Sequence, residues 1–165
     1  MRKHLKHLKN EKGLTLVELL AVIVILGIIA AIAVPAVGNI IENSRKDAQI
    51  ANAESIYNAA RLALISENVV ATEDNVWTFH AVQSNEDQSD KDTDRNVRQI
   101  NLIDERYLDA PPQDPHGDGP YSEAYVTYDG TEYTIVLDSY FNDGDNTGRT
   151  ISDIRSGDRD IVNLD

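Results

Sequence analysis

The chain has 165 residues, with 15 lysines and arginines, 28 aspartates and glutamates and no cysteine, so its formal net charge is −13. This length suits one modest globular domain plus an appendage. The lack of cysteine excludes disulfides, thiolate metal sites and cysteine nucleophiles. Five of the bases and two of the acids lie in the first 41 residues, so residues 42–165 carry 10 − 26 = −16, a charge that repels nucleic acid.

The N-terminus combines a basic leader with a long uncharged segment. Residues 1–13 hold all five of those bases against the single acid Glu11. Residues 19–41 contain no charged side chain, and these 23 residues would span about 35 Å as a helix, against a hydrocarbon core of about 30 Å. The basic flank predicts that the N-terminus stays in the cytoplasm.

Two ordinary interpretations of this segment are a secretory signal peptide and a plain single-pass anchor. Ala31 and Ala33 flank one residue in the small-x-small pattern of a signal-peptidase site. However, the apolar run continues past Ala33 to Ile41, which a signal peptide does not need. Neither interpretation explains Glu18, whose charge is costly inside an apolar segment.

Gly13, Leu14 and Glu18, followed by the apolar run, closely resemble the processing motif of type IV prepilins. The resemblance is strong over residues 12–41. It implies that a prepilin peptidase cuts between Gly13 and Leu14 and that the new amine of Leu14 is methylated. This chain has Leu14 where the family most often has phenylalanine.

Glu18 and Pro35 have physical roles that suit this resemblance. The free amine of Leu14 would be a cation at a helix N-terminus, where the macrodipole disfavours it, and Glu18 lies within the same turn. A paired carboxylate among parallel helices would fix the register between subunits, and the resemblance implies the Leu14 amine of an adjacent subunit as the partner. Pro35 removes an amide donor, which predicts a kink there. Its simpler interpretation is the point where the helix leaves the membrane.

The remainder, residues 42–165, is expected to form a soluble head that opens with an amphipathic helix over about 42–69. Small and apolar residues recur there at spacings of three and four. The predicted buried stripe is Ala48, Ala51, Ser55, Asn58, Leu62, Ile65 and Val69.

The rest of the head predicts an antiparallel sheet covering that helix. Alternating residues around Asp129-Gly130 predict a hairpin over 124–137 with a type I′ turn. We expect a polar loop over 84–96, a short helix near 97–107 and an ordered Pro-Gly turn system over 107–121, which resembles the loop of secretion pseudopilins. Residues 151–165 predict no more than an edge strand or surface segment. The expected fold class is α+β, a long N-terminal helix packed on a small sheet.

Three groups of side chains could suggest a metal. An EF-hand pattern beginning at Asp90 fails, because Arg95 and Asn101 stand where glycine and glutamate are required. A second group lies in a turn where such spacing arises without a metal: Asp114, His116 and Asp118. Pseudopilin relatives often hold calcium in a C-terminal loop, which makes three residues the calcium candidates of an otherwise cofactor-free chain: Asp138, Asp143 and Asp145.

The sequence therefore predicts a structural subunit of a type IV pilus and not an enzyme. Beyond the leader there are only two histidines, His80 and His116, and no phosphate-binding glycine loop. The expected partners are other copies and other pilins, the prepilin peptidase, and an assembly platform with its ATPase. The subunit would be a single-pass membrane protein before assembly and part of a surface filament afterwards. The alternatives are a minor pseudopilin of a secretion or DNA-uptake system, and a membrane-anchored acidic surface domain.

Overall fold

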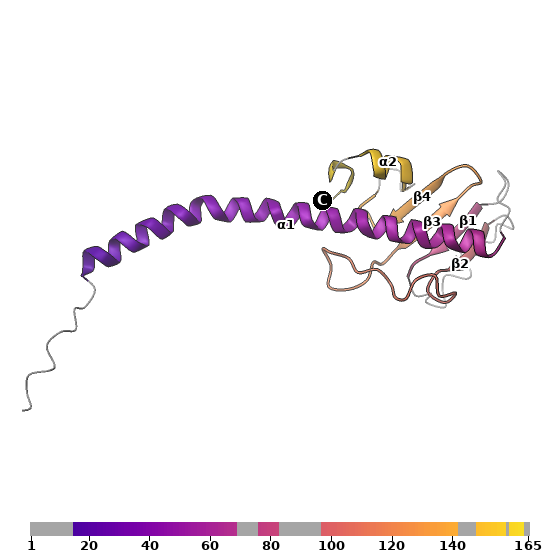
Figure 1. Ribbon diagram of the computed structural model, residues 1–165, viewed down its shortest axis with the longest axis horizontal. Helices are drawn as coiled ribbons and strands as arrows, with labels where there is room; N and C mark the ends of the chain where they lie inside the picture. The colour runs from indigo at the N-terminus through magenta and orange to yellow at the C-terminus, as the bar shows by residue number, and fades with distance from the viewer. Residues whose placement is uncertain (1–14, 69–75, 83–96, 142–147, 158, 164–165) are drawn as a thin grey trace, which may run out of the picture. The chain divides into compact units, whose positions relative to one another are not determined.

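The computed structural model describes residues 15–68, 76–82, 97–141, 148–157 and 159–163 (Figure 1). The chain divides into two compact units, Met1–Glu42 and Asn43–Asp165. Helix α1 (Leu16–Ser66) supplies residues to both units.

In the first unit, α1 has no buried side chain. Its large apolar residues are exposed all round the helix, from 81% at Leu16 to 49% at Ile41. Within the described residues, α1 is the one helix that is long and apolar enough to cross a membrane. The helix includes Pro35 without interruption, and the kink there stays a prediction.

In the second unit, α1 packs on a sheet through its small residues. The buried positions form a continuous stripe: Gln49, Ala53, Ile56, Tyr57, Ala59, Ala60 and Ala63. The predicted stripe was wrong in phase, because Leu62 and Ile65 are 56% and 66% exposed. At 3.6 residues per turn, Leu62 and Ile65 lie on the opposite side of the helix from the buried set, as do Ala51, Ser55 and Asn58. Val69 lies outside the described residues. Alanine allows the sheet to approach closely, and the sheet supplies the bulk of the core.

Within the described residues the sheet has five strands, in the order β2-β1-β3-β4-β5. Their bounds are Val76–His80 (β1), Val97–Asn101 (β2), Ala124–Tyr128 (β3), Tyr133–Leu137 (β4) and Arg149–Thr150 (β5). The predicted α+β class is confirmed, but the sheet is mixed and not antiparallel, because β1 and β2 are parallel. A parallel pair needs a long connection, and in sequence 16 residues separate His80 from Val97. The polar loop predicted over 84–96 lies outside the described residues.

The face of the sheet toward α1 carries the core. Phe79, Val126 and Ile135 lie in register across β1, β3 and β4, and all are fully buried. A neighbouring row places Tyr128 against Tyr133, with ring centroids 4.3 Å apart. Tyr57 of α1 contacts Tyr133 edge-on at 5.0 Å, which fixes the helix over this row.

The hairpin of β3 and β4 is confirmed, but its turn is not type I′. That turn needs positive φ at two residues, whereas only Gly130 has it here, at 95°. The Asp129 carboxylate instead accepts hydrogen bonds from the backbone N–H groups of Thr131 and Glu132, both at 2.8 Å. This side-chain turn closes a four-residue loop over 129–132.

A further prediction about the head was wrong. Residues 97–101 form strand β2 rather than the start of a helix, and the Asn101 side chain ends it by accepting from the N–H of Ile103 at 2.9 Å. The C-terminal segment, which the sequence left open between an edge strand and a surface segment, forms α2 (Ile151–Ser156) and the short helix η1 (Arg159–Ile161). Thr150 caps α2, since its hydroxyl accepts from the N–H of Asp153 at 3.1 Å.

Candidate functional site

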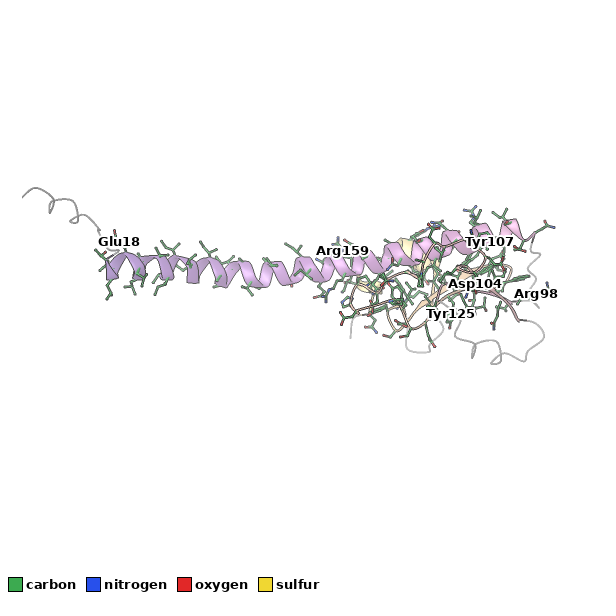
Figure 2. All side chains as sticks on the ribbon, turned by 90° about the horizontal axis from the view of Figure 1, so that it is seen from below. Glu18, Arg98, Asp104, Tyr107, Tyr125 and Arg159 are labelled. Atoms are coloured by element: carbon green, nitrogen blue, oxygen red, sulfur yellow. The ribbon has the colours of Figure 1, made fainter. Side chains whose placement is uncertain are left out.

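The first turn of α1 is closed by a reciprocal pair of side chains, Thr15 and Glu18. The Glu18 carboxylate accepts from the Thr15 N–H at 2.8 Å and from its hydroxyl at 2.9 Å. The Thr15 hydroxyl in turn accepts from the Glu18 N–H at 3.3 Å. This is a capping box, which satisfies donors that a helix N-terminus otherwise leaves free. Figure 2 shows Glu18 at this end of the helix.

The capping box gives Glu18 a local partner that the sequence reasoning missed. Its signal was present as Thr15-x-x-Glu18 directly before the apolar run. The negative carboxylate also suits the positive end of the helix dipole. Gly13 and Leu14, the predicted cleavage and methylation positions, lie outside the described residues.

The Pro-Gly segment over 107–121 is ordered, as predicted, and Asp114 holds it to α1. The two oxygens of the Asp114 carboxylate accept from Gln49 Nε2 at 3.0 Å, from the His116 N–H at 2.9 Å and from the Tyr140 hydroxyl at 2.8 Å. Gln49 is fully buried, and its carbonyl accepts a hydrogen bond from the Tyr121 hydroxyl.

Neighbouring groups complete this polar cluster. Asn52 donates to the Tyr121 hydroxyl at 2.8 Å and to the Gln113 carbonyl at 2.9 Å. Burial and the bond to Asp114 raise the pKa of Tyr140 to about 12, and burial raises the pKa of Tyr121. The tyrosines therefore stay protonated donors at neutral pH. The Asp114 oxygens suggested as metal ligands instead join a loop to a helix.

Asp138 plays a similar part at the end of β4. Its carboxylate accepts from the N–H groups of Ser122 and Glu123 at 3.3 and 2.7 Å. The other calcium candidates, Asp143 and Asp145, lie outside the described residues, as does the acidic stretch around Asp90. The described residues contain no group of three or more carboxylate or imidazole side chains that could hold a metal.

Two arginines hold the C-terminal segment on α1 by bidentate ion pairs. Arg155 donates to both oxygens of Glu54 at 2.8 and 2.9 Å, and its guanidinium lies 4.9 Å from the ring centre of Tyr57. Arg159 donates to both oxygens of Asp47 at 2.6 and 2.8 Å. These hydrogen bonds lower the pKa of both carboxyls.

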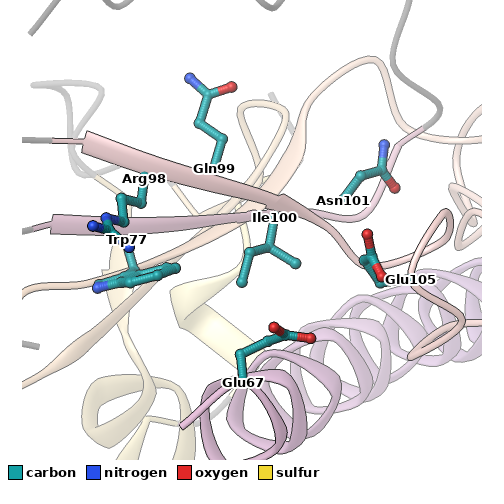
Figure 3. A pocket seen from close by; sticks show the side chains of 7 residues that line it. All are labelled: Glu67, Trp77, Arg98, Gln99, Ile100, Asn101 and Glu105. Atoms are coloured by element: carbon teal, nitrogen blue, oxygen red, sulfur yellow. The ribbon is translucent and has the colours of Figure 1, made fainter. Parts of the chain in front are cut away.

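A surface pocket of about 500 Å³ lies beside strand β2 (Figure 3). The Arg98 guanidinium lies over the Trp77 ring at 5.3 Å, and Glu67 accepts from the Tyr107 hydroxyl at 3.2 Å. The charged groups of Arg98 and Glu67 thus already contact side chains of the same chain. The full lining is Glu67, Trp77, Arg98, Gln99, Ile100, Asn101 and Glu105.

Comparison with known proteins concerns the N-terminal segment. The family described as "Prokaryotic N-terminal methylation motif" matches residues 8–34, which include Gly13, Leu14 and Glu18. Comparison with curated proteins and with solved structures gives no match. Residues 8–34 therefore carry the prokaryotic N-terminal methylation motif, the signature of type IV prepilins.

Proposed function

We propose that this chain is a structural subunit of a type IV pilus or related filament. It is made as a membrane prepilin, cut after Gly13 and polymerised through the N-terminal part of α1. The observation that carries the proposal is the coincidence of the methylation motif with the N-terminal part of α1, residues 16–41, whose large apolar side chains all lie exposed.

Physical chemistry supports the use of that helix in two environments. A fully exposed apolar helix needs lipid or other apolar helices around it, and the same residues can meet both needs. Leaving lipid for neighbouring helices gains little hydrophobic energy, so packing and polar pairing must supply specificity. Glu18 is the one acid within this apolar part of α1, and we assign it the role of pairing with the Leu14 amine of an adjacent copy.

The decisive experiment is the intact mass and N-terminal sequence of protein sheared from the cell surface. The proposal requires a chain that begins at Leu14, and an added methyl group on its amine would establish the second modification. A chain that begins at Met1 and stays with membranes would instead support the membrane-anchored acidic domain. A secreted chain beginning after Ala33 would support a signal peptide.

The same motif serves major pilins and minor pseudopilins, which differ in abundance. Quantifying the processed chain in sheared filaments, relative to total filament protein, separates the two. A chain that forms most of the filament mass is the major subunit. A trace component that is required for secretion or DNA uptake is a pseudopilin of that system.

A further inference from the structure

The sequence contains three Asp-Gly pairs, and two of them lie in described loops: Asp118-Gly119 and Asp129-Gly130. The third, Asp143-Gly144, lies outside the described residues. Glycine has no β-carbon to shield its backbone nitrogen, so an aspartyl carboxyl directly before it is open to attack by the main chain. By sequence alone, both described pairs are candidates for this reaction.

The fold restrains the pair at Asp129. Its carboxylate accepts from the N–H groups of Glu132 and Thr131, both at 2.8 Å, and these bonds lower its pKa. The Gly130 carbonyl accepts from the Tyr128 hydroxyl at 2.9 Å. An attack on this carboxyl must first break both of its hydrogen bonds, and it needs the protonated form, which the lowered pKa makes scarce.

The pair at Asp118 has no such restraint. Within the part of the chain that the structure describes, neither the Asp118 carboxyl nor the Gly119 N–H forms a hydrogen bond, and Asp118 is exposed. Nothing lies within 4 Å of the place where a β-carbon of Gly119 would stand, so the approach to this nitrogen is open. The two reacting groups are therefore available to each other.

We propose that Asp118-Gly119 is a site of spontaneous isomerisation to isoaspartate, from which the fold protects Asp129. The Gly119 nitrogen, on losing its proton, attacks Cγ of the protonated Asp118 carboxyl, and a water molecule leaves as the new C–N bond closes a succinimide. Water then adds to the α-carbonyl carbon of the ring, and the bond from that carbon to nitrogen breaks. The main chain now runs through Cβ and Cγ of residue 118, and the mass is unchanged because the lost water is restored.

Isomerisation would lengthen the main chain inside a closed loop. The Asp114 N–H donates to the Gly119 carbonyl at 2.9 Å, and Gln113 pairs with Pro120, so residue 118 lies between anchored points. Asp114 also joins this loop to α1 through its carboxylate. An extra backbone carbon at residue 118 therefore disturbs the closure of the loop and weakens its hold on the helix.

Ageing the purified full chain in detergent micelles tests this inference, which does not rest on the proposed function. The chain is kept folded in mildly acidic buffer, and isoaspartate is located by isoaspartyl methyltransferase labelling and by fragmentation of proteolytic peptides. Because two hydrogen bonds restrain Asp129, we expect isoaspartate to form at least about tenfold faster at residue 118. In denaturant these hydrogen bonds are lost, so the two rates should become similar.

Two variants supply matched controls. Asp118→Glu should abolish the product at residue 118, because its longer side chain would have to close a larger ring. Gly119→Ala fits the open space and should slow the reaction severalfold, because its methyl group shields the nitrogen. The aged wild-type chain should also unfold at a lower temperature than the fresh chain, whereas aged Asp118→Glu should not.

Four results would overturn the inference. The folded chain could form isoaspartate equally fast at residues 118 and 129, or faster at residue 129. It could form none at residue 118 under conditions in which the denatured control, returned to the same buffer conditions, does so. Isomerisation at residue 118 could also leave the unfolding temperature unchanged, which would contradict the role of this loop in holding the helix.

Discussion

Replacing Gln49 with methionine tests whether the buried polar cluster holds the 107–121 segment on α1. Methionine keeps the volume and removes both hydrogen bonds. The Tyr121 hydroxyl, in a residue only 3% exposed, then loses its acceptor, at a cost of about 1–3 kcal/mol. The Asp114 carboxylate loses one of its three donors, which costs about a further 1–2 kcal/mol. Burial of the apolar methionine side chain offsets part of this loss of stability.

We therefore expect Gln49→Met to lower the free energy of unfolding by about 2–4 kcal/mol, or Tm by about 10 °C. The full chain in detergent micelles is suitable, with near-UV circular dichroism as the signal. All seven tyrosines and the one tryptophan lie in Asn43–Asp165, so this signal reports the head and not the apolar part of α1.

A matched control and a double-mutant cycle make the test specific. Asn58→Met, at an exposed position of the same helix, should change stability by no more than about 0.5 kcal/mol. In a Tyr121→Phe background the Tyr121 hydroxyl is absent, so no buried donor loses its acceptor. There Gln49→Met should lower the free energy of unfolding by about 1 kcal/mol less than in the wild-type background, or by a still smaller amount. Equal costs in both backgrounds, or a cost no greater than that of Asn58→Met, would refute the reasoning.

Three further predictions concern charge and pH. Glu18→Gln keeps a side chain that can cap the helix but removes its charge, so we expect the leader to be removed while sheared filaments are lost. Thr15→Val removes the capping box, and this variant should still form filaments. The opposite pattern would assign Glu18 to capping alone. Burial lowers the pKa of His80, whose ring lies 5.9 Å from that of Tyr125. The stability of the head should therefore fall as the pH drops below about 6.5, the ordinary pKa of histidine. The variant His80→Gln should abolish this pH dependence in unfolding curves measured in micelles. Hydrogen bonds from arginines lower the pKa of Asp47 and Glu54, so the stabilisation by these ion pairs is present above the ordinary carboxyl pKa and is lost as the pH falls through the lowered values. Amide exchange over residues 151–163, corrected for intrinsic rates, should accelerate as the pH falls through that range. Unchanged protection of these amides would contradict the prediction.

Local chemistry made several elements predictable from sequence. The strands of the 124–137 hairpin follow from alternating aromatic and β-branched residues. The ordered Pro-Gly segment follows from its turn residues. The N-terminal motif was identified because leader charge, Gly13, Glu18 and a long apolar run must all coincide, and residues 8–34 indeed carry it.

Long-range pairing was not predictable in the same way. Val97 and Ile100 have the spacing of a helix face, yet β2 pairs in parallel with β1, a choice that depends on partners far away in the chain. A four-residue loop replaced the two-residue turn because the Asp129 carboxylate bonds two N–H groups, an option that the Asp-Gly signal does not reveal. The signal of the capping box was present at Thr15, but the charge of Glu18 indicated the Leu14 amine as its partner and not the Thr15 hydroxyl.

The error in the α1 stripe has a more instructive cause. Assigning the most apolar side of a helix to the core assumes that its own domain is its only apolar partner. Here the sheet brings large side chains such as Phe79 and Ile135, so close packing selects the alanine side, and Ala53, Ala60 and Ala63 are fully buried. Leu62 and Ile65 then lie on the exposed side of the helix. The sheet therefore selects the side of the helix that allows the closest approach and not the side with the largest apolar residues, and this choice depends on strands that lie far away in the chain.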